Sequence, residues 1–244
     1  MLPNCELISC FGSQYLVFKG NDLISNAVRQ QGYEIEVFGV AQKLLEKHEN
    51  GIVLDIGANL GTFTIPLARA NPRLTFHAFE PQRIIYYQFC ANVFINGLDN
   101  VYAHHFGLSN KQDRIKLILP DYATEPNIGA FSIDKEVREN DYECQTKGRD
   151  ETITVFKLDE GYHKNVRLIK VDVEGHELEV LKGATDTIIG NDYPPIIFEA
   201  WNWKPWFEPK RNKLFKFLEK MGYQITEGGN NNLAQHPKFG EMLA

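Results

Sequence analysis

The sequence lacks several features that mark well-known classes of protein. Among its 244 residues, no stretch approaches the roughly 20 apolar residues that a membrane-spanning helix needs. Residues 1–15 include the acidic Glu6 and no basic cluster, which disfavours a secretory signal peptide. An excess of basic residues is also missing, since Lys and Arg number 26 and Asp and Glu number 32. The net charge of −6 argues against bulk binding of nucleic acid.

Cysteine is scarce, and the four cysteines form no metal-binding pattern. They are Cys5, Cys10, Cys90 and Cys144. No two of them make a C-x-x-C pair, and the spacing of Cys5 and Cys10 fits no zinc ribbon. We therefore expect free thiols in a reducing compartment, interpret the chain as a cytoplasmic protein and assign no metal ligands.

The residues that are present are typical of a globular protein, with 43% hydrophobic and 24% charged. The length favours one large domain, or one domain with a small appendage. We expect residues 1–50 to form a strand and helix extension that packs on the core, and residues 51–244 to form the main domain. Residues 120–150 are polar and lack periodicity, so we expect an insertion loop there that acts as a lid or binding loop.

Hydrophobic periodicity predicts strands that alternate with helices. Strands are expected at 14–19, 52–56, 74–80, 101–108, 114–119, 166–173, 195–200, 223–227 and 231–236. Helices are expected at 34–48, 62–70, 82–96, 176–189 and 211–221. This alternation predicts the α/β class: a Rossmann-like, doubly wound, mostly parallel sheet of about seven strands with helices on both faces. Ligands of such sheets bind at the carboxyl ends of the strands.

A glycine-rich turn follows the predicted strand at 52–56. Gly57 and Gly61 allow a sharp turn, and the following N–H groups with the Thr62 hydroxyl can hold a carboxylate. A dinucleotide fingerprint would place glycine where Asn59 and Thr62 stand, so the pyrophosphate cradle is missing. Asp55 would repel a pyrophosphate but suits an ammonium group. An ordinary strand–turn–helix connection is the alternative.

A second acid, Glu80, ends the next predicted strand. A carboxylate there can accept two hydrogen bonds from a ribose diol. A ligand with an amino group, a carboxylate and a ribose but no diphosphate fits both positions. S-adenosylmethionine is such a ligand, and its sulfonium favours an acidic cleft.

Four candidate catalytic residues follow the next two core strands. Asp172, Glu174 and His176 lie where the strand at 166–173 gives way to a helix, and Glu199 ends the strand at 195–200. Three carboxylates at one edge repel one another unless a sulfonium, a substrate hydroxyl or a metal compensates them. A base for a hydroxyl nucleophile is expected here, with Asp172 favoured over Glu174 and His176. Helix stabilisation by Glu174 and a structural hydrogen bond of Glu199 are the alternatives.

Aromatic residues follow Glu199 closely, namely Trp201, Trp203, Trp206 and Phe207. Stacking against a sugar and ordinary packing are both open interpretations of this cluster.

Two motifs, DIGANLGTF at 55–63 and IKVDVEGHELEVLKGA at 169–184, resemble the FkbM-type S-adenosylmethionine-dependent methyltransferases of the class I fold. The resemblance runs from about residue 21 to about residue 237 and includes Gly32–Glu34 and Asn231–Phe239. It implies S-adenosylmethionine as cofactor and methyl transfer to a hydroxyl, typically of a sugar, glycan or polyketide. The cofactor-side residues that it implies are Glu34, Asp55, Gly57, Asn59, Gly61, Glu80, Gly107, Leu108, Ser109 and Asp172.

The function predicted is therefore S-adenosylmethionine-dependent O-methylation of a sugar, glycan or secondary-metabolite acceptor. Small-molecule N-methylation is an alternative, although VDVEGH stands where an N/D-P-P-Y/F loop would be. A nucleotide-sugar or nicotinamide enzyme is another, and the missing glycines count against it. A cofactor-binding scaffold without activity is the last alternative. The sequence leaves the oligomeric state open.

Overall fold

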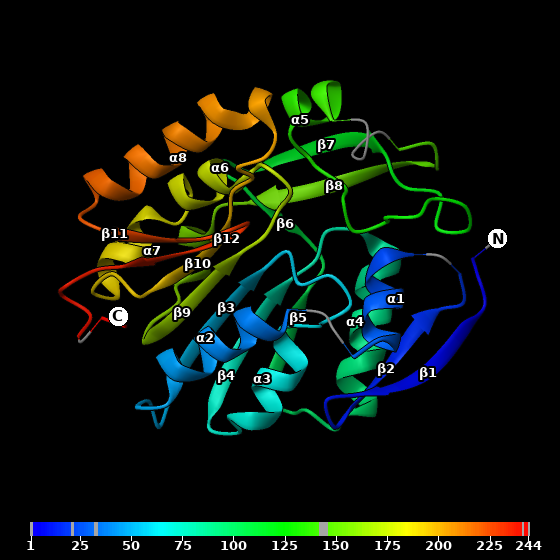
Figure 1. Cartoon of the computed structure of the whole chain (residues 1–244), viewed down its shortest axis with the longest axis horizontal. Helices are drawn as coiled ribbons and strands as arrows, with labels where there is room; N and C mark the ends of the chain where they lie inside the picture. Colours follow the sequence, from blue (N-terminus) through cyan, green and yellow to red (C-terminus); the bar gives the residue numbers. More distant parts are fainter. Residues whose placement is uncertain (1, 21, 32–33, 142–145, 241, 244) are drawn as a thin grey trace.

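The structure is a computed structural model (Figure 1), and it describes residues 2–20, 22–31, 34–141, 146–240 and 242–243. Cys144 and the predicted motif residues Gly32 and Tyr33 lie outside this part of the chain. Among the described cysteines, Cys5, Cys10 and Cys90 are free thiols. In the part of the chain described, we find no helix long and apolar enough to cross a membrane.

A seven-stranded, mostly parallel sheet forms the centre of the molecule, as predicted. Its strand order is β11-β12-β10-β9-β3-β4-β5, and only the β12 edge pairs with its neighbours in antiparallel fashion. The strands are β3 (Gly51–Ile56), β4 (Leu74–Phe79), β5 (Val101–His104), β9 (Val166–Val171), β10 (Ile196–Glu199), β11 (Gln224–Gly228) and β12 (Asn231–Gln235). From β3 the chain order runs outward to β4 and β5 on one side and to β9 and β10 on the other. The sheet therefore has a topological switch point between β3 and β9, where ligands of such sheets bind.

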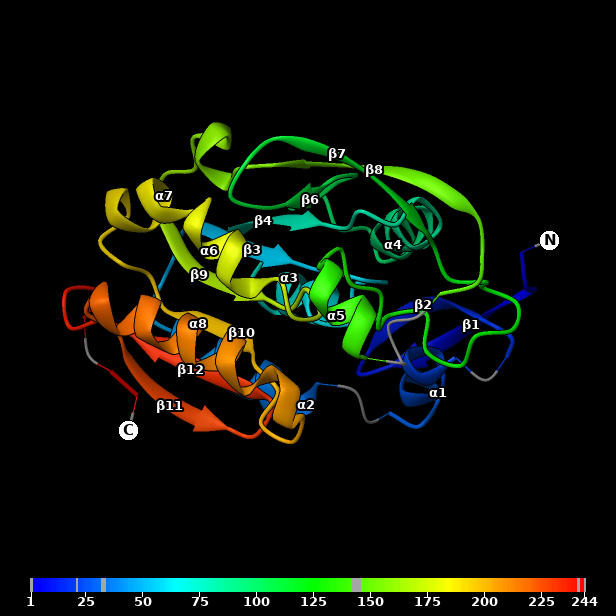
Figure 2. The same ribbon diagram turned by 90° about the horizontal axis from the view of Figure 1, so that it is seen from above.

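Helices cover both faces of this sheet (Figures 1 and 2). On one face lie α2 (Ile35–Leu45), α3 (Thr64–Ala70) and α4 (Arg83–Ile95). On the other lie α6 (Glu177–Lys182), α7 (Thr185–Gly190) and α8 (Glu208–Lys220). Val53 packs toward α2 and α3, whereas the next residue, Leu54, packs toward α6 to α8. Burial on both faces explains the nearly continuous apolar run of β3.

The N-terminal segment forms a hairpin of β1 (Cys5–Cys10) and β2 (Ser13–Phe18), followed by α1 (Leu23–Arg29). The periodicity predicted β2 but neither β1 nor α1. The hairpin packs against α4, where the Leu16 N–H donates to Asn92 Oδ1 at 2.6 Å. This packing places α1 at the carboxyl end of the central sheet. Its residue Ile24 lines the cavity found there.

Residues 105–141 and 146–156 form a second layer over the sheet. Its small sheet has the strand order β6-β8-β7. Two short 3-10 helices, η2 and η3, lie further along the chain. The second layer contains β6 (Gly107–Leu108), β7 (Asp113–Ile118), α5 (Lys135–Asn140) and β8 (Asp150–Phe156). The 3-10 helices are η2 (Leu158–Gly161) and η3 (Pro205–Phe207). The sequence predicted one strand over 101–108, but the chain leaves the central sheet after His104. It also missed β8, and the expected loop at 120–150 contains α5.

One predicted helix is broken into two. The periodicity of residues 176–189 predicts a single helix, whereas α6 ends at Lys182 and α7 begins at Thr185. A Cβ atom on Gly183 would lie 2.0 Å from the carbonyl oxygen of Ser109, so the chain approaches β6 too closely for any other residue. The close approach of Gly183 to the Ser109 carbonyl therefore accounts for the interruption between α6 and α7.

Candidate active site

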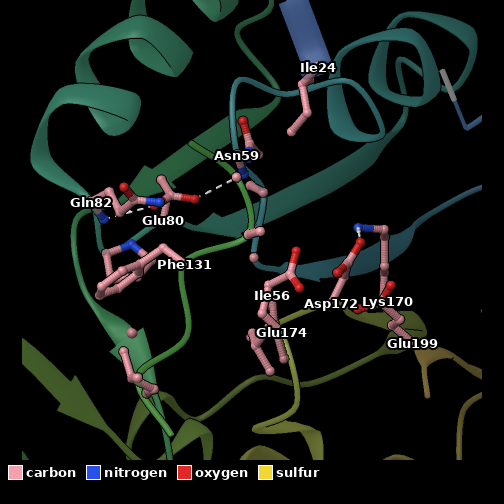
Figure 3. Close-up of a pocket in the computed structure, with 18 of the residues that line it drawn as sticks. Ile24, Ile56, Asn59, Glu80, Gln82, Phe131, Lys170, Asp172, Glu174 and Glu199 are labelled. Atoms are coloured by element: carbon pink, nitrogen blue, oxygen red, sulfur yellow. Dashed lines mark hydrogen bonds and ion pairs between the residues drawn. The ribbon is translucent and has the colours of Figure 1, made fainter. Parts of the chain in front are cut away.

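A cavity of about 360 Å³ lies at the carboxyl ends of β3, β4, β9 and β10. This is within the range of small-molecule sites. The turns after these four strands form its floor, and Ile24 of α1 and Phe131 of the 120–134 loop contribute to its walls (Figure 3). The loop predicted as a lid or binding loop thus supplies part of the cavity lining.

The glycine turn after β3 is required by the protein's own packing. Gly57 has a φ of 89°, and a Cβ there would lie 1.8 Å from the backbone oxygen of Asp172. The ends of β3 and β9 therefore approach each other as closely as glycine allows. Gly61 has a φ of 96°, and its Cβ would press on the rings and methyl groups of Phe89 and Ile65. Gly57 lines the cavity, whereas Gly61 does not.

Glu80 follows β4 and faces the cavity. Its carboxylate accepts backbone N–H bonds from Asn59 at 3.0 Å and from Gln82 at 2.7 Å (Figure 3). Burial raises the pKa of Glu80 to about 7. Each carboxylate oxygen keeps a further lone pair, so Glu80 is fixed in place and can still accept hydrogen bonds from a ligand.

A buried lysine, Lys170, holds three carboxylates together between β3 and β9. Its Nζ lies 3.2 Å from Asp172 Oδ2, 3.3 Å from Glu34 Oε1 and 3.8 Å from Asp55 Oδ1. Burial is the main cause that raises the pKa of Glu34 and of Asp55. Three acids around one ammonium leave this end of the cavity rich in acceptors, which suits a cationic ligand.

Two hydroxyl groups complete this network. Thr62 Oγ1 donates to Glu34 Oε2 at 2.9 Å, and Thr64 Oγ1 donates to Asp55 Oδ2 at 2.6 Å. Asp55 is fully buried behind the cavity wall, whereas Glu34 lines the cavity. Glu34 therefore occupies the cavity-facing position that was expected for Asp55 from the sequence.

A second group of carboxylates lies at the β9–β10 end of the cavity. Asp172, Glu174 and Glu199 each bring one oxygen to within 4.8 Å of the other two. Burial, followed by repulsion from Asp172, raises the pKa of both Glu174 and Glu199 well above the ordinary range. The cluster therefore holds a proton more tightly than isolated carboxylates do.

The turn that presents Glu174 is held by a neighbouring acid. Glu174 has a φ of 54°, a backbone conformation that is unfavourable for a residue with a side chain. Glu177 Oε1 stabilises this turn because it accepts the N–H groups of Val173 at 3.1 Å and Gly175 at 3.0 Å. Burial raises the pKa of Glu177 to about 7. Glu177 thus positions the turn and does not line the cavity.

Comparison with known proteins identifies the family of this fold and cavity. Residues 55–225 match the methyltransferase FkbM domain, which is more than half of the chain. The chain belongs to the FkbM methyltransferase family. The match begins at the buried Asp55 and includes the turns after β3, β4, β9 and β10.

Two fungal relatives and one archaeal relative are similar in sequence to this FkbM methyltransferase. "Methyltransferase 1" of Beauveria bassiana is 30% identical over 157 residues, which are 57% of this chain and 60% of that protein. "Methyltransferase sdnD" of Sordaria araneosa is 29% identical over 72% of this chain and 75% of that protein. The hexuronic acid methyltransferase AglP of Haloferax volcanii is 31% identical over 59% of this chain and 54% of that protein.

The fold is also that of a solved FkbM methyltransferase. The structure from Methylobacillus flagellatus KT has a TM-score of 0.50 and 18% sequence identity, and the match covers 76% of this chain and 43% of that chain. The chain spans less than two thirds of the length of the Beauveria and Haloferax relatives and of the solved structure. The comparisons therefore establish the family and the fold of the matched domain alone.

Most of the predicted site residues meet around the cavity of this FkbM methyltransferase. Those that line it are Glu34, Gly57, Asn59, Thr62, Glu80, Gly107, Leu108, Asp172, Glu174 and Glu199. Asp55, Gly61, Ser109 and His176 do not line it. His176 Nε2 instead lies 3.0 Å from Ser109 Oγ, and its Nδ1 lies 3.6 Å from Asp134 Oδ2. His176, which precedes α6, therefore makes polar contacts with the residue after β6 and with the residue before α5.

Two lysines of the site were missed. β9 carries two basic residues, Arg167 and Lys170, and Lys170 stands between the apolar Ile169 and Val171 at the buried end of the strand, which was a usable signal. Lys204 lines the cavity, with its Nζ 3.9 Å from the centroid of the Trp201 ring and in an ion pair with Asp141. Trp201 and Trp203 line the cavity, whereas Trp206 packs beside Trp201.

Proposed function

We propose that this protein is an S-adenosylmethionine-dependent O-methyltransferase that acts on a hydroxyl of a sugar, glycan or secondary metabolite. The observation that carries the proposal is the arrangement of acids around one cavity. At one side Glu80 is fixed by two backbone N–H groups, in a position suited to a ribose. At the other side lie the carboxylates around Lys170 and the cluster of Asp172, Glu174 and Glu199. That layout suits a ligand that carries a diol and positive charge and lacks phosphate.

The residues present fit this cofactor. Among the described residues, Asp55 Oδ1 and Glu199 Oε2 are buried oxygens without a hydrogen-bond partner, and both lie at the acid-rich end. Glu34 and Asp172 line the same end and face Lys170. The surplus of carboxylates over ammonium groups there favours a ligand with an ammonium and a sulfonium.

The chain's own residues would contribute binding, orientation and proton transfer. S-adenosylmethionine supplies an electrophilic methyl group when it is bound. Glu80 accepts the two ribose hydroxyls, and Glu34 with Asp172 holds the amino-acid end. Asp172, Glu174 and Glu199 face the acceptor, and a carboxylate of raised pKa among them accepts the hydroxyl proton. Correct alignment of the acceptor oxygen supplies much of the remaining rate enhancement, about 7–11 kcal/mol at best.

The acceptor class is supported by the rim of the cavity and by one relative. Trp201 and Trp203 offer aromatic surfaces beside the acid cluster, which suit the apolar face of a sugar ring. The Haloferax relative is named for methylation of a hexuronic acid. Lys204 at the same rim can pair with an acidic acceptor.

Calorimetric titration with S-adenosylhomocysteine, beside NAD and a nucleotide sugar, tests the cofactor. We expect only the first to bind, and binding of NAD alone would refute the proposal. Incubation with labelled S-adenosylmethionine and a panel of uronic acids, neutral glycans, polyketides and amines then tests the acceptor. We expect a mass increase of one methyl group on a hydroxyl, whereas a product methylated on nitrogen would favour the N-methyltransferase alternative.

A further inference from the structure

The acid cluster of Asp172, Glu174 and Glu199 has the donor set of a cation site. We propose that these three side chains bind one divalent cation of the magnesium or manganese class at the acceptor end of the cavity. The site itself stands on the carboxylate geometry, and only the role given to the cation rests on the proposed function. From the sequence, a metal is one of three ways to compensate these carboxylates, although no metal ligands were assigned.

The ligand atoms suit a hard cation. One oxygen from each carboxylate lies within 4.8 Å of the other two. Oxygens around a cation such as Mg²⁺ stand about 3 to 4 Å apart, so small side-chain rotations close the set. Carboxylate oxygens without sulfur or imidazole ligands select Mg²⁺ or Mn²⁺ over softer metals. The remaining coordination positions open into the cavity, which all three residues line.

A second observation at Glu199 points to a missing ligand. Glu199 lines the cavity, yet its Oε2 is shielded from solvent and has no hydrogen-bond partner among the described residues. An unpaired carboxylate oxygen in a protein interior is costly. Figure 3 shows Glu199 beside Asp172 and Lys170, with Glu174 across the cavity floor. A cation among the three would satisfy this oxygen.

The two neighbouring lysines offset only part of the charge of the cluster, although the charge of Lys204 lowers the pKa of Glu174. Lys170 reaches Asp172, but it also serves Glu34 and Asp55. Lys204 forms an ion pair with Asp141 and lies over the Trp201 ring. Three clustered carboxylates therefore retain negative charge that a divalent cation would neutralise.

At this position the cation would bind the acceptor hydroxyl and lower its pKa. The hydroxyl oxygen then forms its bond to the methyl carbon as the sulfur–carbon bond breaks, and the electron pair stays on sulfur. The hydroxyl proton passes to a carboxylate oxygen of the cluster that does not hold the cation.

Manganese binding to the full chain tests the site without any acceptor. Protein freed of metal with a chelator is titrated with Mn²⁺, and the free ion is followed by its paramagnetic resonance signal. We expect one Mn²⁺ per chain, and about ten-fold or greater weakening in both Glu199→Gln and Glu174→Gln. The matched control is Glu219→Gln, an exposed residue of α8, which should bind Mn²⁺ like the wild type.

Absence of binding at about 1 mM Mn²⁺, or equal binding by all variants, would overturn the site and leave a shared proton as the explanation of the cluster. S-adenosylhomocysteine binding is measured on the same samples with chelator present. If the nucleoside binds and Mn²⁺ does not, the cation site fails and the proposed function stands. If Mn²⁺ binds and the nucleoside does not, the cation site stands and the proposed function fails.

Discussion

The two sides of the cavity handle buried negative charge in different ways. Glu80 stands apart from other acids, and two backbone N–H groups at 2.7 and 3.0 Å fix its carboxylate. Asp172, Glu174 and Glu199 instead bring one oxygen each to within 4.8 Å of one another, and the turn after β9 that presents Glu174 has a strained backbone at that residue. The first arrangement is built to hold a ligand in one orientation. The second stores electrostatic repulsion that a proton, a cation or a cationic ligand relieves, as expected where chemistry takes place.

The largest effect is expected on turnover at the crowded side. Glu174→Gln should lower the rate of methyl transfer by about 10²–10⁴-fold, because it removes a carboxylate that faces the acceptor. The affinity for S-adenosylhomocysteine should remain close to that of the wild type. Steady-state kinetics and calorimetry measure the two quantities, and loss of affinity with unchanged turnover would reverse the roles given to the two sides.

A large effect on stability is expected at Lys170. Lys170→Met leaves Glu34, Asp55 and Asp172 without their shared ammonium, which should cost about 3–5 kcal/mol of unfolding free energy. Lys216→Met, at an exposed position of α8, should change it by no more than about 0.5 kcal/mol. Urea denaturation compares the two variants, and equal stabilities would show that Lys170 does not hold the acids together.

Glu80 should affect cofactor affinity more than turnover at saturation. Glu80→Gln replaces a charged acceptor by a neutral amide and should weaken S-adenosylhomocysteine binding by about 1.5–3 kcal/mol. Turnover with saturating cofactor should fall far less than in Glu174→Gln. If the affinity does not change, Glu80 serves only the turns after β3 and β4.

A pH dependence of stability is also expected, from the two buried glutamates of raised pKa. Burial raises the pKa of Glu80 and of Glu177 to about 7, above the ordinary glutamate value of 4.5. The folded state therefore keeps protons that the unfolded chain loses. The contribution of these groups is full below about pH 4.5 and is lost as the pH rises through about 7, at about 1.4 kcal/mol per pKa unit.

Urea denaturation at several pH values between about 5 and 8 measures this slope. Glu80→Gln should flatten it, since the variant removes one of the two titrating groups. The same slope in wild type and variant would mean that Glu80 is ionised throughout this range.

Much of the fold was readable in the sequence because its core strands are buried on both faces. The apolar runs of β3, β4, β9 and β10 predicted the parallel sheet, and of the acids predicted at their ends all but Asp55 line the cavity. The segment 105–156 was harder to predict, because only two residues of β8, Ile153 and Val155, and one residue of α5, Val137, are fully buried.

The sequence by itself determined which residues stand at the ends of the strands, since that follows from local hydrophobic patterning. Only the tertiary structure decided which of them meet. It buried Asp55 behind the cavity wall, turned His176 toward Ser109 and drew Asp172, Glu174 and Glu199 into one cluster. Distances between separate strand ends depend on how closely β3, β9 and β10 pack, and no local pattern encodes that spacing.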